Sequence, residues 1–464
     1  MYRLLLALAL VMAVGLTAGL YVGAGRAPGP VIEILQPTAL VGRSAVFQAV
    51  VEAPGSELTA LEAVIQQNGV VHPLLSLARP EEAEIDQDGP DQLRVTRSFD
   101  RQSHPDLRSG PAQVRVSATR PVLFGLREAS ATVAADVEVR LQPPRLAAIS
   151  TFHYVNHGGA ELVVYTVSPP DAESGVRVGD NLYPGYAASG LIEGAGEDVR
   201  LAFFALLHDQ DLGTPIELYA RDAAGNEASA AFDHRRFPRN FRRSRIEVSD
   251  RFLRRVVPPI VSRTPELADE EPDGSDDDWL ELYLFINGEL RRLNRATLVA
   301  LAAETSPQML WEGAFRQLGN SQVESGFADH RTYTHEGAEI DQQVHLGFDL
   351  ASTANAPVLA ANGGVVVYAD YFGIFGNCVI IDHGMGLQSL YAHLSAIGVA
   401  AGDLVERDDR LGLTGQTGLA GGDHLHYATL LQGRPVSPIE WWDPHWIEDR
   451  VLRKIRAISP AAAP

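Results

Sequence analysis

The sequence predicts a mostly β protein in which helices are confined to the N-terminus and one internal linker. Three observations lead to this prediction: an uncharged apolar run at residues 4–22, short β-type runs separated by turn residues over 31–234, and a glycine- and valine-rich stretch from residue 341 onward. Alternation with a period of two and turns about every ten residues are typical of sheets packed face to face. We therefore expect two β-sandwich modules and, after a helical linker, a compact antiparallel β domain.

The apolar run from Leu4 to Val22 is long enough to cross a bilayer as a helix. It is also long for the apolar part of a signal peptide, and no Ala-x-Ala cleavage site follows it. We therefore favour a signal anchor over residues 1–26 rather than a signal peptide. The expected location is the cell envelope, with the chain anchored in the cytoplasmic (inner) membrane and the remainder outside the cytoplasm, which is the periplasm in a Gram-negative cell. Secretion after signal cleavage is the alternative.

The two β modules are expected over residues 31–142 and 143–234. The first contains alternating runs such as Ser44–Val51. The second ends in Ile216–Glu227, a strand that leads into a Gly-Asn turn and resembles the final hairpin of bacterial immunoglobulin-like modules. Neither region shows residues that suggest catalysis, so we expect them to be spacers or binding modules for a protein partner in the cell envelope.

Residues 235–310 are predicted to be a charged linker with helices. Nine arginines fall within residues 235–255, and an acidic tract covers 266–278. Such charge runs are usually solvated, which we favour over the alternative that the arginines bind an anionic polymer or lipid headgroup. Asn287 is predicted to cap one helix, and Ser306, followed by a proline, to begin another.

Charge and cysteine content exclude two classes of protein. The formal net charge of −21 argues against nucleic acid as a partner. The single cysteine, Cys378, excludes an intramolecular disulfide framework. Its apolar neighbours indicate a buried strand, so we expect a small core residue rather than a nucleophile.

Histidine-containing motifs in the last third of the chain suggest a metal site. Seven of the 14 histidines lie between residues 330 and 426, and four of them fall in three short motifs: His345-Leu346-Gly347-Phe348-Asp349, Tyr391-Ala392-His393-Leu394-Ser395 and Gly421-Gly422-Asp423-His424-Leu425-His426. His424 and His426 are two residues apart on a strand-like run, so their rings share one face. His345 and Asp349 are also an even number of residues apart. Two or three imidazoles with one carboxylate form the donor set of a catalytic zinc site.

In this order, the motifs resemble those of the lysostaphin/LytM-type zinc endopeptidases. The resemblance extends from about Phe327 to Trp446 and includes the Asn-Cys-Val-Ile-Ile-Asp-His-Gly run that begins at residue 377. It implies that three residues bind one zinc ion and that two histidines act beside it. The implied metal ligands are His345, Asp349 and His426, and the implied catalytic pair is His393 and His424.

Acid–base chemistry suggests how the two histidines divide the work, and the resemblance implies the substrate. His424 is assigned as the base that orients the attacking water and His393 as the group that stabilises the tetrahedral intermediate, with the reverse assignment left open. The expected activity is zinc-dependent hydrolysis of peptide cross-links in bacterial peptidoglycan by a domain over residues 311–446, with 447–464 as a C-terminal tail. An inactive scaffold that activates a cell-wall amidase is the chief alternative, although none of the five key positions is lost. A secreted protease acting on glycine-rich protein, and autoinhibition by a residue within 327–343, are further alternatives.

Overall fold

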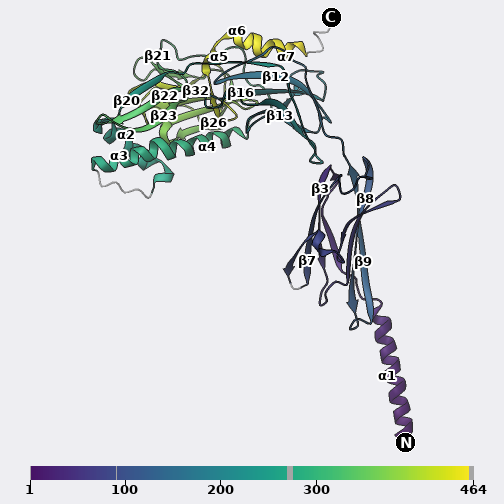
Figure 1. Ribbon diagram of the computed structural model, residues 1–464. Coiled ribbons are helices and arrows are strands. Elements are labelled where there is room, and N and C mark those ends of the chain that lie inside the picture. The colour runs from purple at the N-terminus through teal and green to yellow at the C-terminus, as the bar shows by residue number, and fades with distance from the viewer. Residues whose placement is uncertain (1, 90, 269–274, 459–464) are drawn as a thin grey trace. The chain divides into compact units, whose positions relative to one another are not determined.

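The computed structural model describes residues 2–89, 91–268 and 275–458. The chain forms two compact units, one comprising Met1–Pro144 with Arg221–Ala228 and the other Arg145–Ala220 with Ser229–Pro464. Both units are built mostly from β-strands, which confirms the predicted fold class (Figure 1).

Helix α1 (Tyr2–Ala24) covers the predicted apolar run. Its segment Leu5–Ala24 has a mean hydropathy of 2.3, and none of it is buried against the rest of the chain. The predicted N-terminal apolar helix is therefore confirmed, and it is long and apolar enough to cross a membrane. A signal sequence shares these properties.

The first unit is a sandwich of two sheets. One sheet has the strand order β1-β3-β7-β6 and the other β2-β9-β8-β4-β5. The strands are β1 (Val31–Gln36), β2 (Leu40–Val41), β3 (Ser44–Glu52), β4 (Ala60–Gln67), β5 (Val70–Ser76), β6 (Glu84–Gly89), β7 (Gln92–Asp100), β8 (Gly110–Val122) and β9 (Arg127–Val139). Phe47 and Val95 of one sheet share a hydrophobic core with Ile65 and Val116 of the other, so the alternation read from the sequence does place one face of each sheet inward.

The second unit begins with two four-stranded sheets, ordered β10-β12-β16-β15 and β14-β13-β17-β18. Their strands are β10 (Arg145–Ala148), β12 (Gly159–Ser168), β13 (Glu173–Val178), β14 (Asn181–Pro184), β15 (Tyr186–Ala187), β16 (Val199–Leu206), β17 (Ile216–Arg221) and β18 (Glu227–Ala230). A two-stranded parallel pair joins β11 (His153–Asn156) to β19 (His234–Phe237). The immunoglobulin-like character of this region stays a prediction.

The C-terminal strands form one large sheet and two small ones. The large sheet has the order β21-β24-β32-β28-β27-β26-β30, with β33 beside β32, and the small sheets are β20-β22-β23 and β25-β31-β29. The strands are β20 (Arg243–Glu247), β21 (Gln322–Ser325), β22 (Asp329–His335), β23 (Ala338–His345), β24 (Phe348–Ala351), β25 (Pro357–Leu359), β26 (Gly364–Tyr371), β27 (Asn377–Gly384), β28 (Leu387–Leu394), β29 (Ala396–Ile397), β30 (Leu404–Val405), β31 (Arg410–Leu413), β32 (Leu425–Leu431) and β33 (Arg434–Val436). Cys378 is fully buried on β27, as predicted.

Helices of the predicted linker region pack on these strands. They are α2 (Asp250–Arg263), α3 (Asp276–Phe285) and α4 (Arg291–Ala302), with a π-helical turn (Ile286–Leu290) that makes 276–302 continuous. Apolar residues of α2, α3 and the π-helical turn share a core with Tyr333 of β22 and with Ile374. Figure 1 draws these helices in teal. The part of the linker that the structure describes is thus an ordered layer beside the C-terminal strands.

Two expected helix starts are wrong. Asn287 does not cap a helix: Ser275 does, through its side chain, and Asn287 lies fully buried within the π-helical turn. No helix begins at Ser306, because its N–H donates to the carboxylate of Asp382, 2.9 Å away, and Met385 N–H donates to its carbonyl. These bonds tie this segment to the turn after β27 instead.

One continuous hydrophobic core joins the sandwich of the second unit to its C-terminal strands. Phe203 of β16 packs on Trp441, with ring centroids 5.6 Å apart. Polar groups cross the same boundary: Lys454 donates to Glu161 at 2.8 Å, and Glu440 accepts hydrogen bonds from β12.

The chain after β33 is helical where the structure describes it. It forms α5 (Pro438–Trp442), α6 (Pro444–Trp446), a π-helical turn (Ile447–Leu452) and α7 (Arg453–Ala457). The last part of the predicted tail, 459–464, lies outside the described residues.

Candidate metal centre and active site

Strand pairing brings the predicted metal ligands together. Asp349 on β24 pairs directly with His426 on β32, and His426 also pairs with Ala392 on β28, the residue before His393. His345 is the last residue of β23, and only two residues separate it from the start of β24. The distant motifs therefore meet where the end of β23 lies beside three neighbouring strands of the large sheet, β24, β32 and β28.

The donor atoms of these three residues converge on one point. Asp349 Oδ1 lies 2.9 Å from His345 Nε2 and 3.0 Å from His426 Nδ1, and the two ring nitrogens are 3.0 Å apart. All three side chains are largely buried. Around a tetrahedral zinc ion with bonds of about 2.0–2.1 Å, donor atoms lie about 3.3 Å apart, so movements of a few tenths of an ångström fit the ion. The donor set and its spacing therefore suit zinc.

Gly347 allows this close approach. A Cβ atom at this position would lie 2.6 Å from both Cε1 and Nε2 of the His426 ring and 2.7 Å from the carbonyl oxygen of Tyr427. Because no real side chain tolerates such contacts, the glycine in the first motif is a steric requirement of the site.

Backbone carbonyls orient three of the four histidines. His345 Nδ1 lies 3.0 Å from Gly326 O, His393 Nδ1 lies 2.8 Å from Thr417 O, and His424 Nδ1 lies 2.8 Å from Gly422 O. A carbonyl oxygen only accepts, so each Nδ1 carries the proton. Each Nε2 of a neutral ring is then left with its lone pair free, as metal binding or general-base action requires.

His393 and His424 stand next to the three donors. The His393 ring centroid is 4.9 Å from that of His424 and 5.7 Å from that of His426. His424 Nε2 lies 3.5 Å from Asp349 Oδ1. His393 has a φ of 62°, a strained conformation for a side chain of this size that is typical of functional positions.

Burial and mutual contacts set the protonation of this group. Burial raises the pKa of Asp349, but the surrounding histidines outweigh burial and hold its pKa well below the ordinary value. Burial lowers the pKa of His426 to about 4 and that of His393 well below its usual range. Burial also acts to lower the pKa of His424, yet its contact with Asp349 leaves that pKa raised. The site thus combines one carboxylate with mostly neutral imidazoles, the ionisation state that a divalent cation prefers.

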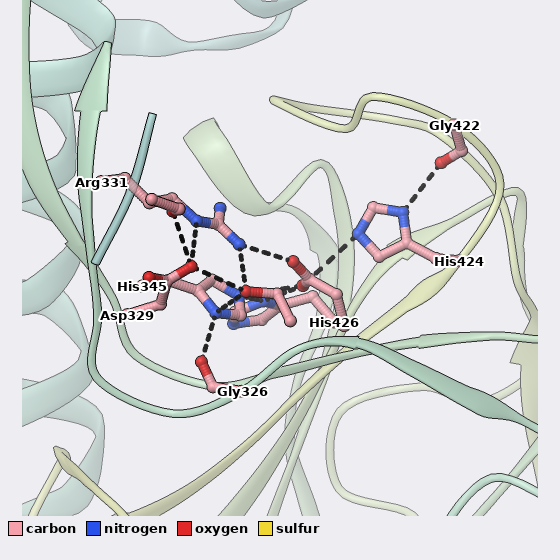
Figure 2. A network of polar contacts seen from close by, with 10 residues as sticks. Gly326, Asp329, Arg331, His345, Gly422, His424 and His426 are labelled. Carbon is pink, nitrogen blue, oxygen red and sulfur yellow. Dashed lines mark hydrogen bonds and ion pairs between the residues drawn. The ribbon is translucent and has the colours of Figure 1, made fainter. Parts of the chain in front are cut away.

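Arg331 of β22 contacts the other oxygen of the carboxylate. Its Nη2 donates to Asp349 Oδ2 at 2.9 Å and to Ser325 Oγ at 2.8 Å, while its Nε lies 3.7 Å from Asp329 Oδ2. Figure 2 shows the guanidinium beside the rings of His345 and His426, with His424 approaching from the opposite side. Arg331 fixes the orientation of Asp349, so it is a positioning residue for the metal ligand.

A cavity of about 300 Å³ opens onto this group. Its walls include the four histidines and Asp349, and also side chains that come from the helical layer, namely Phe252, Tyr283, Asn287 and Arg291. The helices that the sequence suggested were part of a linker therefore form one wall of the site.

All five predicted site residues lie together, while the supporting residues were not predicted. His345, Asp349 and His426 form the donor group, and His393 and His424 flank it. Arg331 and Arg291 lie outside the three histidine-containing sequence motifs. One signal was available in the sequence. Asp329 and Arg331 are two residues apart, so on a strand their side chains share one face, and Asp329 is the residue that pairs with His345.

Comparison with known proteins identifies the region that carries this site. The model of peptidase family M23 matches residues 343–438. The DD-carboxypeptidase/endopeptidase Mpg of Neisseria meningitidis is 40% identical over 97 residues, which is 21% of this chain and 22% of that protein. The peptidoglycan DD-endopeptidase ShyA of Vibrio cholerae is 42% identical over 96 residues, which is 21% of this chain and 22% of that protein.

These two relatives match only part of the chain. The chain spans about a fifth of the length of these curated relatives. Among solved structures, the catalytic domain of lysostaphin from Staphylococcus simulans is 24% identical, with a TM-score of 0.24 that covers 28% of this chain and 98% of that domain. Both the matched region and the five site residues within it lead to one conclusion: the C-terminal part of this chain is a peptidase family M23 domain.

Proposed function

We propose that this protein is a zinc-dependent endopeptidase that hydrolyses the peptide cross-links of bacterial peptidoglycan. The observation that carries the proposal is the convergence of His345, Asp349 and His426, with His393 and His424 beside them. The names of the relatives, DD-endopeptidase and DD-carboxypeptidase/endopeptidase, support a peptide of the cell wall as the substrate class.

Each residue has a distinct task in this proposal. His345, Asp349 and His426 hold the zinc ion, which when bound supplies Lewis acidity to the reacting water and carbonyl group. His424 accepts the proton of the attacking water at Nε2, the ring nitrogen that lies 3.5 Å from Asp349 Oδ1. His393 stabilises the oxygen that gains negative charge as the tetrahedral intermediate forms; because its Nδ1–H is held by Thr417 O, this role requires a second proton on Nε2, so that His393 acts as an imidazolium.

An inactive scaffold that activates a cell-wall amidase is disfavoured by the same geometry. A scaffold gains nothing from buried donor atoms about 3 Å apart, from a strained His393 or from Nδ1 protons held by backbone carbonyls. All five chemical groups are present and oriented. We therefore place the scaffold second.

The membrane location is part of the proposal. Helix α1 would anchor the chain in the cytoplasmic membrane, with the M23 domain outside the cytoplasm, where peptidoglycan lies. A cell-envelope protein that binds the β-sandwiches is also proposed rather than seen.

Mass spectrometry of cell-wall fragments tests the function. Purified cross-linked peptidoglycan dimers are incubated with the full chain in detergent and zinc, and with a His345→Ala variant. The full chain is needed because the M23 strands share their core with residues 145–220. We expect conversion of dimers into monomers by the wild-type protein and none by the variant. Intact dimers with zinc-loaded wild-type protein would favour the scaffold.

A further inference from the structure

One cation on the wall of the active-site cavity is in direct contact with no carboxylate of the described chain. Arg291, in the first turn of α4, lines the cavity together with His345 and His426. Among the residues that the structure describes, no carboxylate lies within ion-pair distance of its guanidinium. Arg331, which faces the same cavity, differs because Asp349 and Asp329 neutralise it.

The guanidinium of Arg291 is held in place by neutral groups. Its Nε donates to the carbonyl oxygen of Asn287 at 3.0 Å, and its Nη2 donates to the side-chain oxygen of the same residue at 2.6 Å. Asn287 is fully buried and in turn donates to Asp341 Oδ2 at 2.6 Å. Of the guanidinium nitrogens, Nη1 makes no hydrogen bond to any residue within the described ranges. The buried Asn287 therefore fixes the orientation of the guanidinium and leaves its Nη1 available to a ligand.

This arrangement is costly without a ligand. Burial lowers the pKa of the Arg291 guanidinium and the positive charge of Arg331 acts in the same direction, while Tyr333, Tyr283 and the carboxylate of Asp341 act against them without reversing the shift. A buried cation that faces another cation, and whose nearest carboxylate, Asp341, reaches it only through the side chain of Asn287, is unfavourable, since its lost hydration is only partly replaced. Glu324 also lines the cavity, but it is exposed and forms no ion pair with Arg291 within the described chain.

We propose that Arg291 binds a carboxylate of the substrate peptide within the active-site cavity. The inference rests on the proposed function and adds a substrate class: peptides that carry a free carboxylate close to the bond that is cut. A carboxylate accepts hydrogen bonds from a guanidinium in its plane, and this pairing is stronger than one between neutral groups. Asn287 is the positioning residue that aims the guanidinium.

Two synthetic cross-linked peptides test the proposal. They differ in one respect: the carboxylates near the cross-link are free in one and converted to carboxamides in the other. For the wild-type protein we expect kcat/KM to be about tenfold to a hundredfold higher on the free carboxylate, as expected for a hydrogen bond to a charged group. Arg291→Gln should reduce this ratio to about threefold or less, and Arg291→Lys should keep part of it.

The neighbouring arginine provides a matched control. Arg292 is exposed and pairs with Glu289 at 2.6 Å on the outer face of the helix, so Arg292→Gln should leave the ratio at the wild-type value. Equal rates on the two peptides with the wild-type protein would overturn the inference, whatever the variants do. So would an unchanged ratio in Arg291→Gln that binds zinc normally.

Failure of the proposed function would look different. In that case the wild-type protein would cleave neither peptide. Calorimetric titration with the two peptides would then test carboxylate binding by Arg291 independently of catalysis. Tighter binding of the free carboxylate, by tenfold or more, would support it. Equal affinities would refute it.

Discussion

Glu440 links the M23 domain to the preceding sandwich, and its ionisation should make stability depend on pH. Its carboxylate accepts hydrogen bonds of 2.7 Å from both Asn156 Nδ2 and Ala160 N. Burial raises the pKa of Glu440 from 4.5 to about 7. The folded chain thus holds this proton more tightly than the unfolded chain, so the contribution of Glu440 to stability is greatest at low pH. It is lost progressively as the pH rises from the unfolded pKa through the folded one.

The size of the effect follows from the two pKa values. One pKa unit corresponds to about 1.4 kcal/mol, and integration between about pH 5 and pH 8 gives a loss of about 2.5 kcal/mol in the free energy of unfolding. Glu440→Gln removes the titration. The amide oxygen can accept only one of the two hydrogen bonds well, which adds an offset of about 1 kcal/mol that does not vary with pH.

Urea unfolding followed by tryptophan fluorescence measures both quantities, because Trp441 is fully buried beside Glu440. We expect Glu440→Gln to gain about 2.5 kcal/mol relative to the wild-type protein between about pH 5 and pH 8. Glu406→Gln, at an exposed position, is the control and should show a constant difference. A constant difference for Glu440→Gln as well would refute the reasoning.

Three further variants probe the site and the core. Gly347→Ala should displace the His426 ring and weaken zinc binding at least tenfold in a chelator competition; unchanged affinity would show that the close contact is unimportant. Lys454→Met should lower the free energy of unfolding by about 3 kcal/mol in urea, because Glu161 is left charged and buried, and a smaller loss in the double variant with Glu161→Gln would confirm the cause. His393→Ala should reduce kcat at least about a hundredfold with zinc content unchanged, and full turnover would remove His393 from the mechanism.

The residues proposed as metal ligands could be singled out in the sequence because their signal is local. His424 and His426 share a face through the two-residue period of a strand, and His345 and Asp349 lie within five residues. The spacing within each motif therefore indicates which side chains point the same way. The family resemblance added only that the separate motifs form one site. The mostly β fold was predictable for the same reason, since alternation is visible within single strands such as β4.

The supporting residues depend on contacts between distant parts of the chain. Arg331 reaches Asp349 because β22 pairs with β23, and Arg291 reaches the cavity because the helical layer folds back onto the strands. The charged residues of the linker suggested solvation, yet apolar side chains such as Leu253 and Ile260 bury one face of α2. No local pattern encodes such pairings.

Helix ends and buried charges were unpredictable for related reasons. Asn287 is a residue type that often caps helices, but here the helix continues past it through a π-helical turn. Its side-chain amide donates to Asp341 Oδ2 instead of capping a helix end. Glu161 and Lys454 are 293 residues apart, and charged residues of these types usually lie at the surface. In the fold they form a buried hydrogen-bonded pair. Their partners are visible only in three dimensions.

Zinc titration of the metal-free protein tests the central claim most directly. The full chain is stripped with a chelator, zinc is returned in known amounts, and hydrolysis of cross-linked peptidoglycan dimers is followed at each step. If His345, Asp349 and His426 form one catalytic zinc site, activity is absent at first and rises in proportion to zinc until one ion is bound per chain. Hydrolysis by the metal-free protein, or none with one zinc ion bound, would contradict the account.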